Sequence, residues 1–154
     1  MKVQSMKMLL VLGLLIGVGN ATARAQALID DTAIEADVPH AFIVKDKTLP
    51  AGKYIVKRLD DTQPNVLEIR SANGRTAITF ETESVQANQI PRKAELAFDK
   101  VGDQYFLSKI WTPDSDFGYQ LPKSKAEERP EGSVVQAEHH SIFAKVFKRT
   151  KGAK

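Results

Sequence analysis

Apolar and polar residues alternate in strand-like fashion from about residue 34 onward. The clearest pattern flanks Asn73-Gly74, where residues 66–71 and 76–81 are rich in β-branched and aromatic side chains. Asn-Gly favours a two-residue type I′ hairpin turn, because both positions need a positive φ. The hairpin predicts four cross-strand pairs: Leu67 with Phe80, Glu68 with Thr79, Ile69 with Ile78, and Arg70 with Ala77.

A second hairpin, over residues 95–112, is predicted to form the middle of the core. If Val101-Gly102 is its loop, an opposite-charge pair lies beside the turn and large apolar pairs lie behind it. The pairs would be Lys100 with Asp103, Phe98 with Tyr105, and Leu96 with Leu107. Both faces of this hairpin are largely apolar, which is typical of central strands that are covered on both sides.

Shorter strands are predicted before and between these hairpins, over residues 34–38, 41–44 and 54–59. Pro39 interrupts the first of them, which favours an edge strand or a bulge. Pro50 and Gly52 are typical turn residues. Strands at this spacing predict a single antiparallel all-β domain of roughly seven or eight strands, either a sandwich or a small barrel.

The end of the domain carries a pattern that favours helices. Residues 133–136 fit a capping box, and Ile142, Phe143, Val146 and Phe147 fall on one face at helical spacing. We therefore expect a helix over residues 137–148 and a short surface helix over 124–128. The alternative is a closing strand over residues 133–137.

The first 25 residues have the features of a signal peptide. A basic start is followed by twelve apolar residues, Met8–Gly19, and then by small residues two apart, with cleavage expected after Ala25. Twelve residues would span about 18 Å of helix, short of a ~30 Å hydrocarbon core, so an uncleaved anchor is the less favoured alternative. Residues 26–33 form a loose lead-in to a domain over 34–148.

Removal of this leader changes the charge and the inferred location. The chain has 22 Lys and Arg against 19 Asp and Glu, and the leader takes Lys2, Lys7 and Arg24, so the mature chain is formally neutral. Net charge therefore does not favour nucleic acid as a partner. The chain has no cysteine, and export without disulfides suggests a bacterial protein that is periplasmic or secreted.

The remaining positive charge is concentrated at the C-terminal end, where residues 149–154 form a basic tail. No acid occurs among the last ten residues. Such an end is either a solvated tail or a weak contact with anionic lipid or polymer. Its basic residues are Lys145, Lys148, Arg149, Lys151 and Lys154.

Residues 48–56, Thr-Leu-Pro-Ala-Gly-Lys-Tyr-Ile-Val, resemble the LPAG-x-Y-x-V turn and strand of exported β-sandwich modules of the prealbumin-like or carboxypeptidase-regulatory-like kind. In those modules the aromatic residue after the glycine packs inward. Most of the chain between residues 38 and 128 resembles small exported bacterial β-proteins of unknown function. The shared features are the LPAGKY turn, the Asn-Gly hairpin, a GDQYFL strand before Trp111, and Leu121–Ser124. This resemblance implies a fold but no catalytic residues.

Residue spacing offers little support for catalysis or metal binding. Of the three histidines, His139 and His140 are adjacent and point apart on either a helix or a strand, and His40 is distant in sequence. The chain has no thiol nucleophile and no Gly-x-Ser-x-Gly elbow. Asp114 and Asp116 precede a glycine, but the further ligands of an EF-hand are missing. We predict no enzyme, no metal site and no cofactor.

Two sets of residues are candidates for binding. The turn-rich loop around residue 115 is a candidate contact loop, with Asp114, Asp116, Phe117 and Tyr119. Aromatic residues of the second hairpin could instead line a cavity, namely Phe98, Tyr105, Phe106 and Trp111. We therefore expect an exported, non-catalytic β-domain that binds an unknown protein or a cell-envelope polymer. The alternative is a small-ligand carrier with an aromatic-lined barrel cavity.

Overall fold

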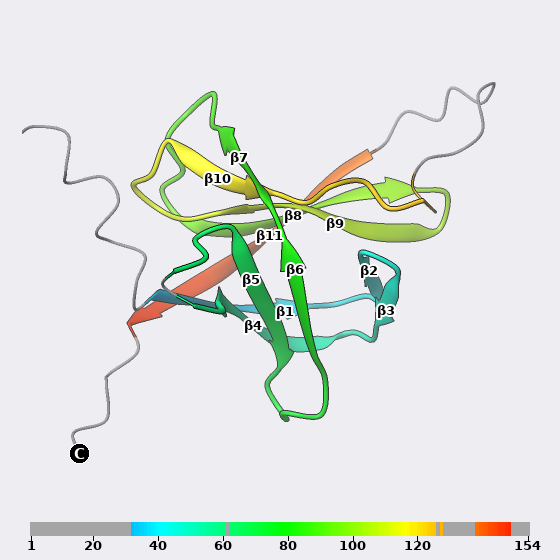
Figure 1. Cartoon of the computed structure of the whole chain (residues 1–154). Coiled ribbons are helices and arrows are strands. Elements are labelled where there is room, and N and C mark those ends of the chain that lie inside the picture. The colour runs from blue at the N-terminus through cyan, green and yellow to red at the C-terminus, as the bar shows by residue number, and fades with distance from the viewer. Residues whose placement is uncertain (1–31, 61, 126, 128–137, 149–154) are drawn as a thin grey trace, which may run out of the picture.

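The computed structural model describes residues 32–60, 62–125, 127 and 138–148, and every regular element within these ranges is a β-strand (Figure 1). None of the described segments is a helix that is long and apolar enough to cross a membrane. The strands are β1 Thr32–Val38, β2 Phe42–Val44, β3 Lys47–Leu49, β4 Gly52–Arg58, β5 Val66–Ser71, β6 Ala77–Glu81, β7 Glu83–Gln86, β8 Ala94–Val101, β9 Gln104–Trp111, β10 Phe117–Gln120 and β11 Glu138–Lys148.

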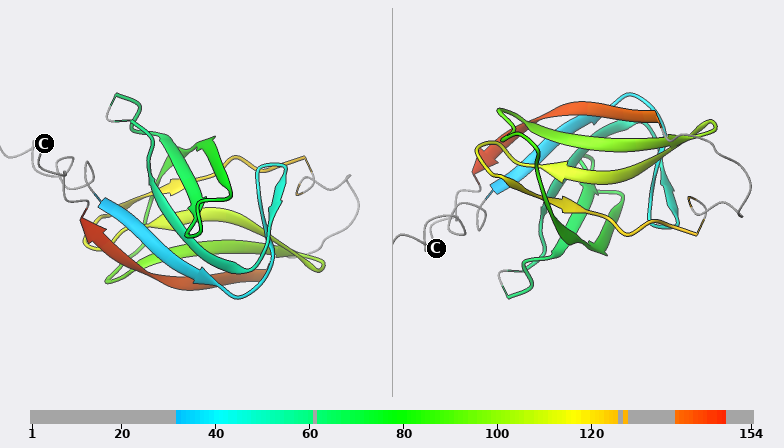
Figure 2. Two further views of the ribbon diagram at one scale, coloured as in Figure 1. Left: turned by 90° about the horizontal axis from the view of Figure 1, so that it is seen from below. Right: turned by 90° about the horizontal axis from the view of Figure 1, so that it is seen from above.

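The strands form one curled sheet in the order β3-β2-β9-β8-β11-β1-β4-β5-β6, with β10 pairing both β9 and β7. All pairings are antiparallel except the one between β2 and β9. Only Thr82 separates β6 from β7, so a single bent segment pairs with β5 and then with β10 (Figures 1 and 2). At this bend the backbone N–H and the hydroxyl of Thr82 both donate to the carbonyl of Asn65, at 2.9 and 2.8 Å.

The core occupies the inner face of the curled sheet. Along β8, Ala94, Leu96 and Phe98 are buried and alternate with half-buried residues, as expected for a strand with one face inward. Near the centre, the ring of Phe42 meets Tyr54 and Phe98 edge-on, with centroids 5.1 and 5.4 Å apart. Such edge-to-face contacts stabilise aromatic cores.

The Asn73-Gly74 hairpin has the predicted register, and all four expected pairs form between β5 and β6. The predicted type I′ turn is wrong. Gly74 has a φ of 71°, but among the described non-glycine residues only Lys45 and Asp114 have a positive φ, so Asn73 does not. A four-residue loop is closed instead by two hydrogen bonds, from the Ser71 N–H to the Thr76 carbonyl and from the Gly74 N–H to the Ser71 carbonyl.

The second hairpin is present, but its predicted register is wrong. Its two-residue turn is Gly102-Asp103, with Gly102 at a φ of 63°, so Lys100 pairs with Tyr105 and Phe98 with Leu107. An irregularity between Ala97 and Phe98 then pairs Leu96 with Ile110. On its outer face, Val101 and Phe106 form a second, smaller cluster with Ile43 of β2, the strand that pairs beside β9.

The predicted helix over residues 137–148 is wrong, because residues 138–148 form strand β11. This strand pairs with β8 along its first part and with β1 along its last part. The predicted helix over 124–128 is not shown: Ser124, Lys125 and Glu127 are not helical, and the other two residues lie outside the described part of the chain. The expected leader, the alternative strand over 133–137 and the tail over 149–154 also lie outside it.

Candidate functional site

The six exposed large apolar side chains of the described residues gather at one end of the curled sheet, called here the apolar end. It consists of residues 59–60 and 62–65, the connections 87–93 and 112–116, Phe117 at the start of β10, and residues 143–147 of β11. These segments lie together because antiparallel strands bring alternate connections to the same end (to the left in Figure 1). The six residues are Leu59, Ile90, Phe117, Phe143, Val146 and Phe147.

Two of the connections at the apolar end are joined by backbone hydrogen bonds. The Ala87 N–H donates to the Asp116 carbonyl at 2.7 Å, and the Asp114 N–H donates to the Pro91 carbonyl at 3.0 Å. The two loops therefore form one surface, called here the paired loops, which consists of residues 87–93 and 112–117. It displays Ile90 and Phe117, which are 61% and 51% exposed.

Three of the four predicted contact residues, Asp114, Asp116 and Phe117, are exposed on the paired loops. The fourth, Tyr119, is half-buried and packs against the main core. Sequence reasoning missed Ile90, because the connector that holds it shows no regular pattern. A single apolar residue next to Pro91 in a polar stretch was the only local signal.

The four aromatic residues predicted to line a cavity do not surround one space. Phe98 is fully buried in the main core, whereas Phe106 belongs to the second cluster. Tyr105 is half-buried beside His40, with stacked rings 3.7 Å apart. Trp111 is half-buried and its ring covers Gly118, where an added Cβ would lie 2.7 Å from the Trp111 Cζ3 atom.

The three histidines lie at the opposite end of the sheet, where two of them contact the ring of Tyr105 and the third contacts an aspartate. His40 stacks on Tyr105, and His140 meets the same ring edge-on at 5.3 Å. His139 Nδ1 lies 2.7 Å from Asp99 Oδ1 instead. Among the described residues, no group of three or more histidine, aspartate and glutamate side chains is placed to hold a metal ion.

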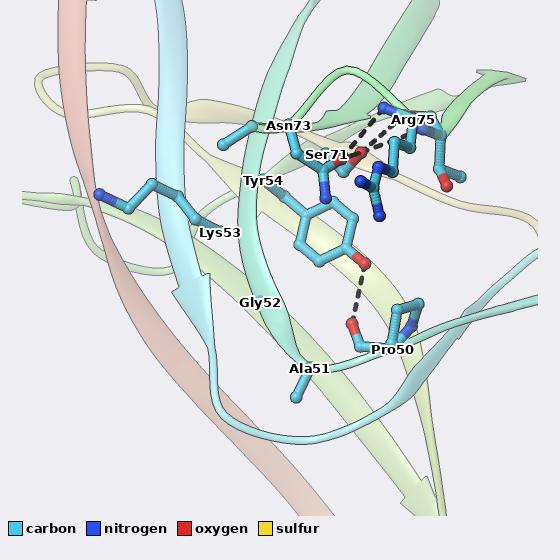
Figure 3. A pocket seen from close by; sticks show the side chains of 10 residues that line it. Pro50, Ala51, Gly52, Lys53, Tyr54, Ser71, Asn73 and Arg75 are labelled. Carbon is cyan, nitrogen blue, oxygen red and sulfur yellow. Dashed lines mark hydrogen bonds between the residues drawn. The ribbon is translucent and has the colours of Figure 1, made fainter.

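A hollow of about 470 Å³ lies between the LPAG turn and the Asn-Gly hairpin (Figure 3). Tyr54 forms part of its wall but is buried, and its hydroxyl donates to the Pro50 carbonyl at 2.8 Å. Burial raises the pKa of Tyr54. Asn73 Oδ1 accepts from the Ser71 hydroxyl and from the Arg75 N–H, at 2.7 and 3.0 Å. These hydrogen bonds stabilise the two turns. The polar groups that make them therefore have partners within the protein and do not by themselves indicate a ligand site.

Comparison of the chain with protein-family models, with curated proteins and with solved structures finds no significant match. The most distinctive surface feature of the molecule is the apolar end.

Proposed function

We propose that this protein is an exported, non-catalytic β-domain that binds a protein or another cell-envelope partner through the paired loops. The observation that carries the proposal is the joint display of Ile90 and Phe117 on two loops whose backbones are hydrogen-bonded together. Exposed apolar side chains held on an ordered backbone lose little conformational freedom on binding, and their burial supplies binding free energy.

The surroundings of Phe117 indicate the character of the partner. Asp114 and Asp116 are both exposed beside it, so the partner would offer an apolar pocket bordered by basic groups. Such charge complementarity contributes mainly to the association rate and to specificity.

The proposal includes two further inferences, one on export from the sequence and one on architecture from the strand pairing. We infer that residues 1–25 are removed on export, which leaves a domain without cysteine in the periplasm or the medium. We also interpret the curled sheet as a small barrel rather than a sandwich, because β6 and β7 carry one chain segment from β5 to β10. A carrier function has less support, because the four candidate lining residues lie in separate places.

Site-specific crosslinking tests the proposed contact. A photo-crosslinking phenylalanine analogue at position 117, in the cells that produce the protein, should give a discrete adduct. The same analogue at Thr79, an exposed residue of β6, serves as the matched control. Ile90→Ser should reduce the adduct from position 117 about tenfold or more, because a buried Ile side chain contributes about 1.5–3 kcal/mol. An absent adduct, or the same adducts from both positions, would contradict the proposal.

A further inference from the structure

The outer face of β11 forms a second exposed surface, which adjoins the paired loops at Lys93. His140, Ile142 and Ala144 are half-buried, whereas the residues between them are exposed, as expected for a strand with one face outward. Phe143 and Phe147 both lie on the outer face, about 13 Å apart along the strand, and are 67% and 40% exposed. Two exposed aromatic residues on the same face of one strand are unusual on a surface that contacts only water.

Basic side chains accompany these two rings. Lys93 Nζ lies 5.2 Å from the centroid of the Phe143 ring, and Lys145 is exposed between the two phenylalanines. Two acids lie opposite the strip: Glu95, opposite Phe143, accepts from the Ser141 hydroxyl, and Glu35, opposite Lys145, lies 3.4 Å from Lys53 Nζ. We call Lys93, Phe143, Lys145 and Phe147 the basic-aromatic strip.

We propose that the basic-aromatic strip binds the surface of an anionic lipid bilayer. Phe143 and Phe147 would enter the interfacial layer, and Lys93 and Lys145 would contact the headgroups. An apolar insertion combined with a basic cluster is the combination that gives a peripheral protein stable membrane affinity, because either one alone is weak.

The position of the strip relative to the rest of the chain supports a bilayer as the partner. Lys148 pairs with Thr32, so the two ends of the described domain lie side by side next to the strip. The next six residues along the chain include Arg149, Lys151 and Lys154 and no acid. Additional positive charge therefore begins where the strip ends. Each lysine or arginine near an anionic membrane adds about fivefold to binding.

Vesicle co-sedimentation of the chain that starts at Gln26 tests this inference. We expect binding to phosphatidylcholine vesicles that contain about one third phosphatidylglycerol, and no binding to pure phosphatidylcholine. Binding should weaken strongly when salt rises from about 0.05 M to about 0.5 M. Phe143→Ser with Phe147→Ser should weaken it about tenfold or more, and Lys93→Gln or Lys145→Gln about fivefold each. Ile90→Ser with Phe117→Ser is the matched control and should leave it unchanged.

A fluorescent probe provides a second readout that does not depend on the double variant folding. Since the chain has no cysteine, Phe143→Cys creates a single site for an environment-sensitive label. Its emission should shift to the blue with anionic vesicles, whereas the same label at Thr79→Cys should not shift. No sedimentation of the unmodified chain, equal sedimentation of the two double variants, or an unshifted label at position 143 would each overturn the inference. So would binding to soluble dextran sulfate without binding to vesicles.

The two proposals share only Lys93 and depend on different apolar residues, Ile90 and Phe117 for the paired loops and Phe143 and Phe147 for the strip, so they can fail separately. Loss of the crosslink at position 117 with intact vesicle binding would reject only the paired loops as a partner site. Loss of vesicle binding with an intact crosslink would reject only the bilayer.

Discussion

Gly118 shows how a single missing side chain shapes the apolar end. A Cβ at this position would lie 2.7 Å from the Cζ3 atom of Trp111, closer still to Cε3 of the same ring, and 2.8 Å from the Ile110 carbonyl oxygen. Real Cβ atoms do not approach other atoms so closely, and the backbone oxygen belongs to the strand ladder that holds β10 against β9. The glycine therefore lets the tryptophan cover the start of β10, beside the paired loops.

We expect Gly118→Ala to destabilise the protein by about 1–3 kcal/mol, because the ring or β10 must move. Urea denaturation would measure the loss of unfolding free energy. Gly74→Ala is a useful comparison, since a Cβ there meets no atom within 4 Å and only its positive φ is unfavourable. A loss at Gly118 no larger than that at Gly74 would show that the close packing of Trp111 is not required for stability.

Glu68 is a second position where local chemistry has a measurable consequence. Its carboxylate accepts hydrogen bonds from Arg70 Nε and Nη2, at 3.1 and 3.3 Å, and lies 3.5 Å from Lys57 Nζ. Burial opposes its ionisation, but the hydrogen bonds and charges of Arg70 and Lys57 outweigh that cost and lower its pKa below the ordinary value of 4.5.

A lowered pKa in the folded state means that ionised Glu68 stabilises the fold above about pH 4.5, and that this contribution is lost as the pH falls through the folded-state pKa. We expect Glu68→Gln to cost about 1–2 kcal/mol at neutral pH and much less in acid. Denaturation midpoints measured from pH 7 down to about pH 3 would test this, with Glu81→Gln, at an exposed position, as the control. A constant difference across that range would contradict the assignment.

At the scale of elements, β11 is the clearest case in which local pattern and tertiary pairing disagree. Ile142, Phe143, Val146 and Phe147 fit one face of a helix. In the structure Ile142 packs against the core, while Phe143 points outward and is 67% exposed. As a strand, β11 gives backbone partners to β8 along its first part and to β1 along its last part, whereas a helix would leave both of those strand edges without them.

Neighbouring substitutions distinguish the two arrangements. We expect Ile142→Ala to cost about 2 kcal/mol, because it removes contacts with the core. Phe143→Ala should cost no more than about 0.5 kcal/mol, since its side chain is on the outer face. Thermal or urea unfolding of both variants would measure this difference. Equal losses for the two positions would favour a helix in which both side chains face the core.

The two hairpins illustrate what local patterns can and cannot determine. The register around Asn73-Gly74 was predictable because the alternation of Leu67, Ile69, Ile78 and Phe80 specifies which residues face inward. The turn type was not, since a four-residue loop preserves the same register. In the second hairpin, both faces offered apolar residues, so alternation did not distinguish the predicted register from the observed one, which contains an irregularity.

At the scale of the whole molecule, the curled sheet brings distant segments together. The first and last described strands, β1 and β11, are neighbours, and the bent segment formed by β6 and β7 connects β5 with β10 (Figure 2). Both proposed surfaces follow from this arrangement. Ile90 joins Phe117 only because two loops share hydrogen bonds, and Lys93 meets Phe143 only because β11 lies beside β8.

Local pattern was enough to predict the all-β class and the register of the Asn73-Gly74 hairpin. These follow from side-chain alternation and turn composition, which act over a few residues. Long-range pairing, by contrast, makes residues 138–148 a strand, places Phe98 and Phe106 in different clusters, and collects the exposed apolar residues at one end. Those outcomes depend on pairing between segments that are far apart in sequence, and no local pattern encodes which edge a segment will meet.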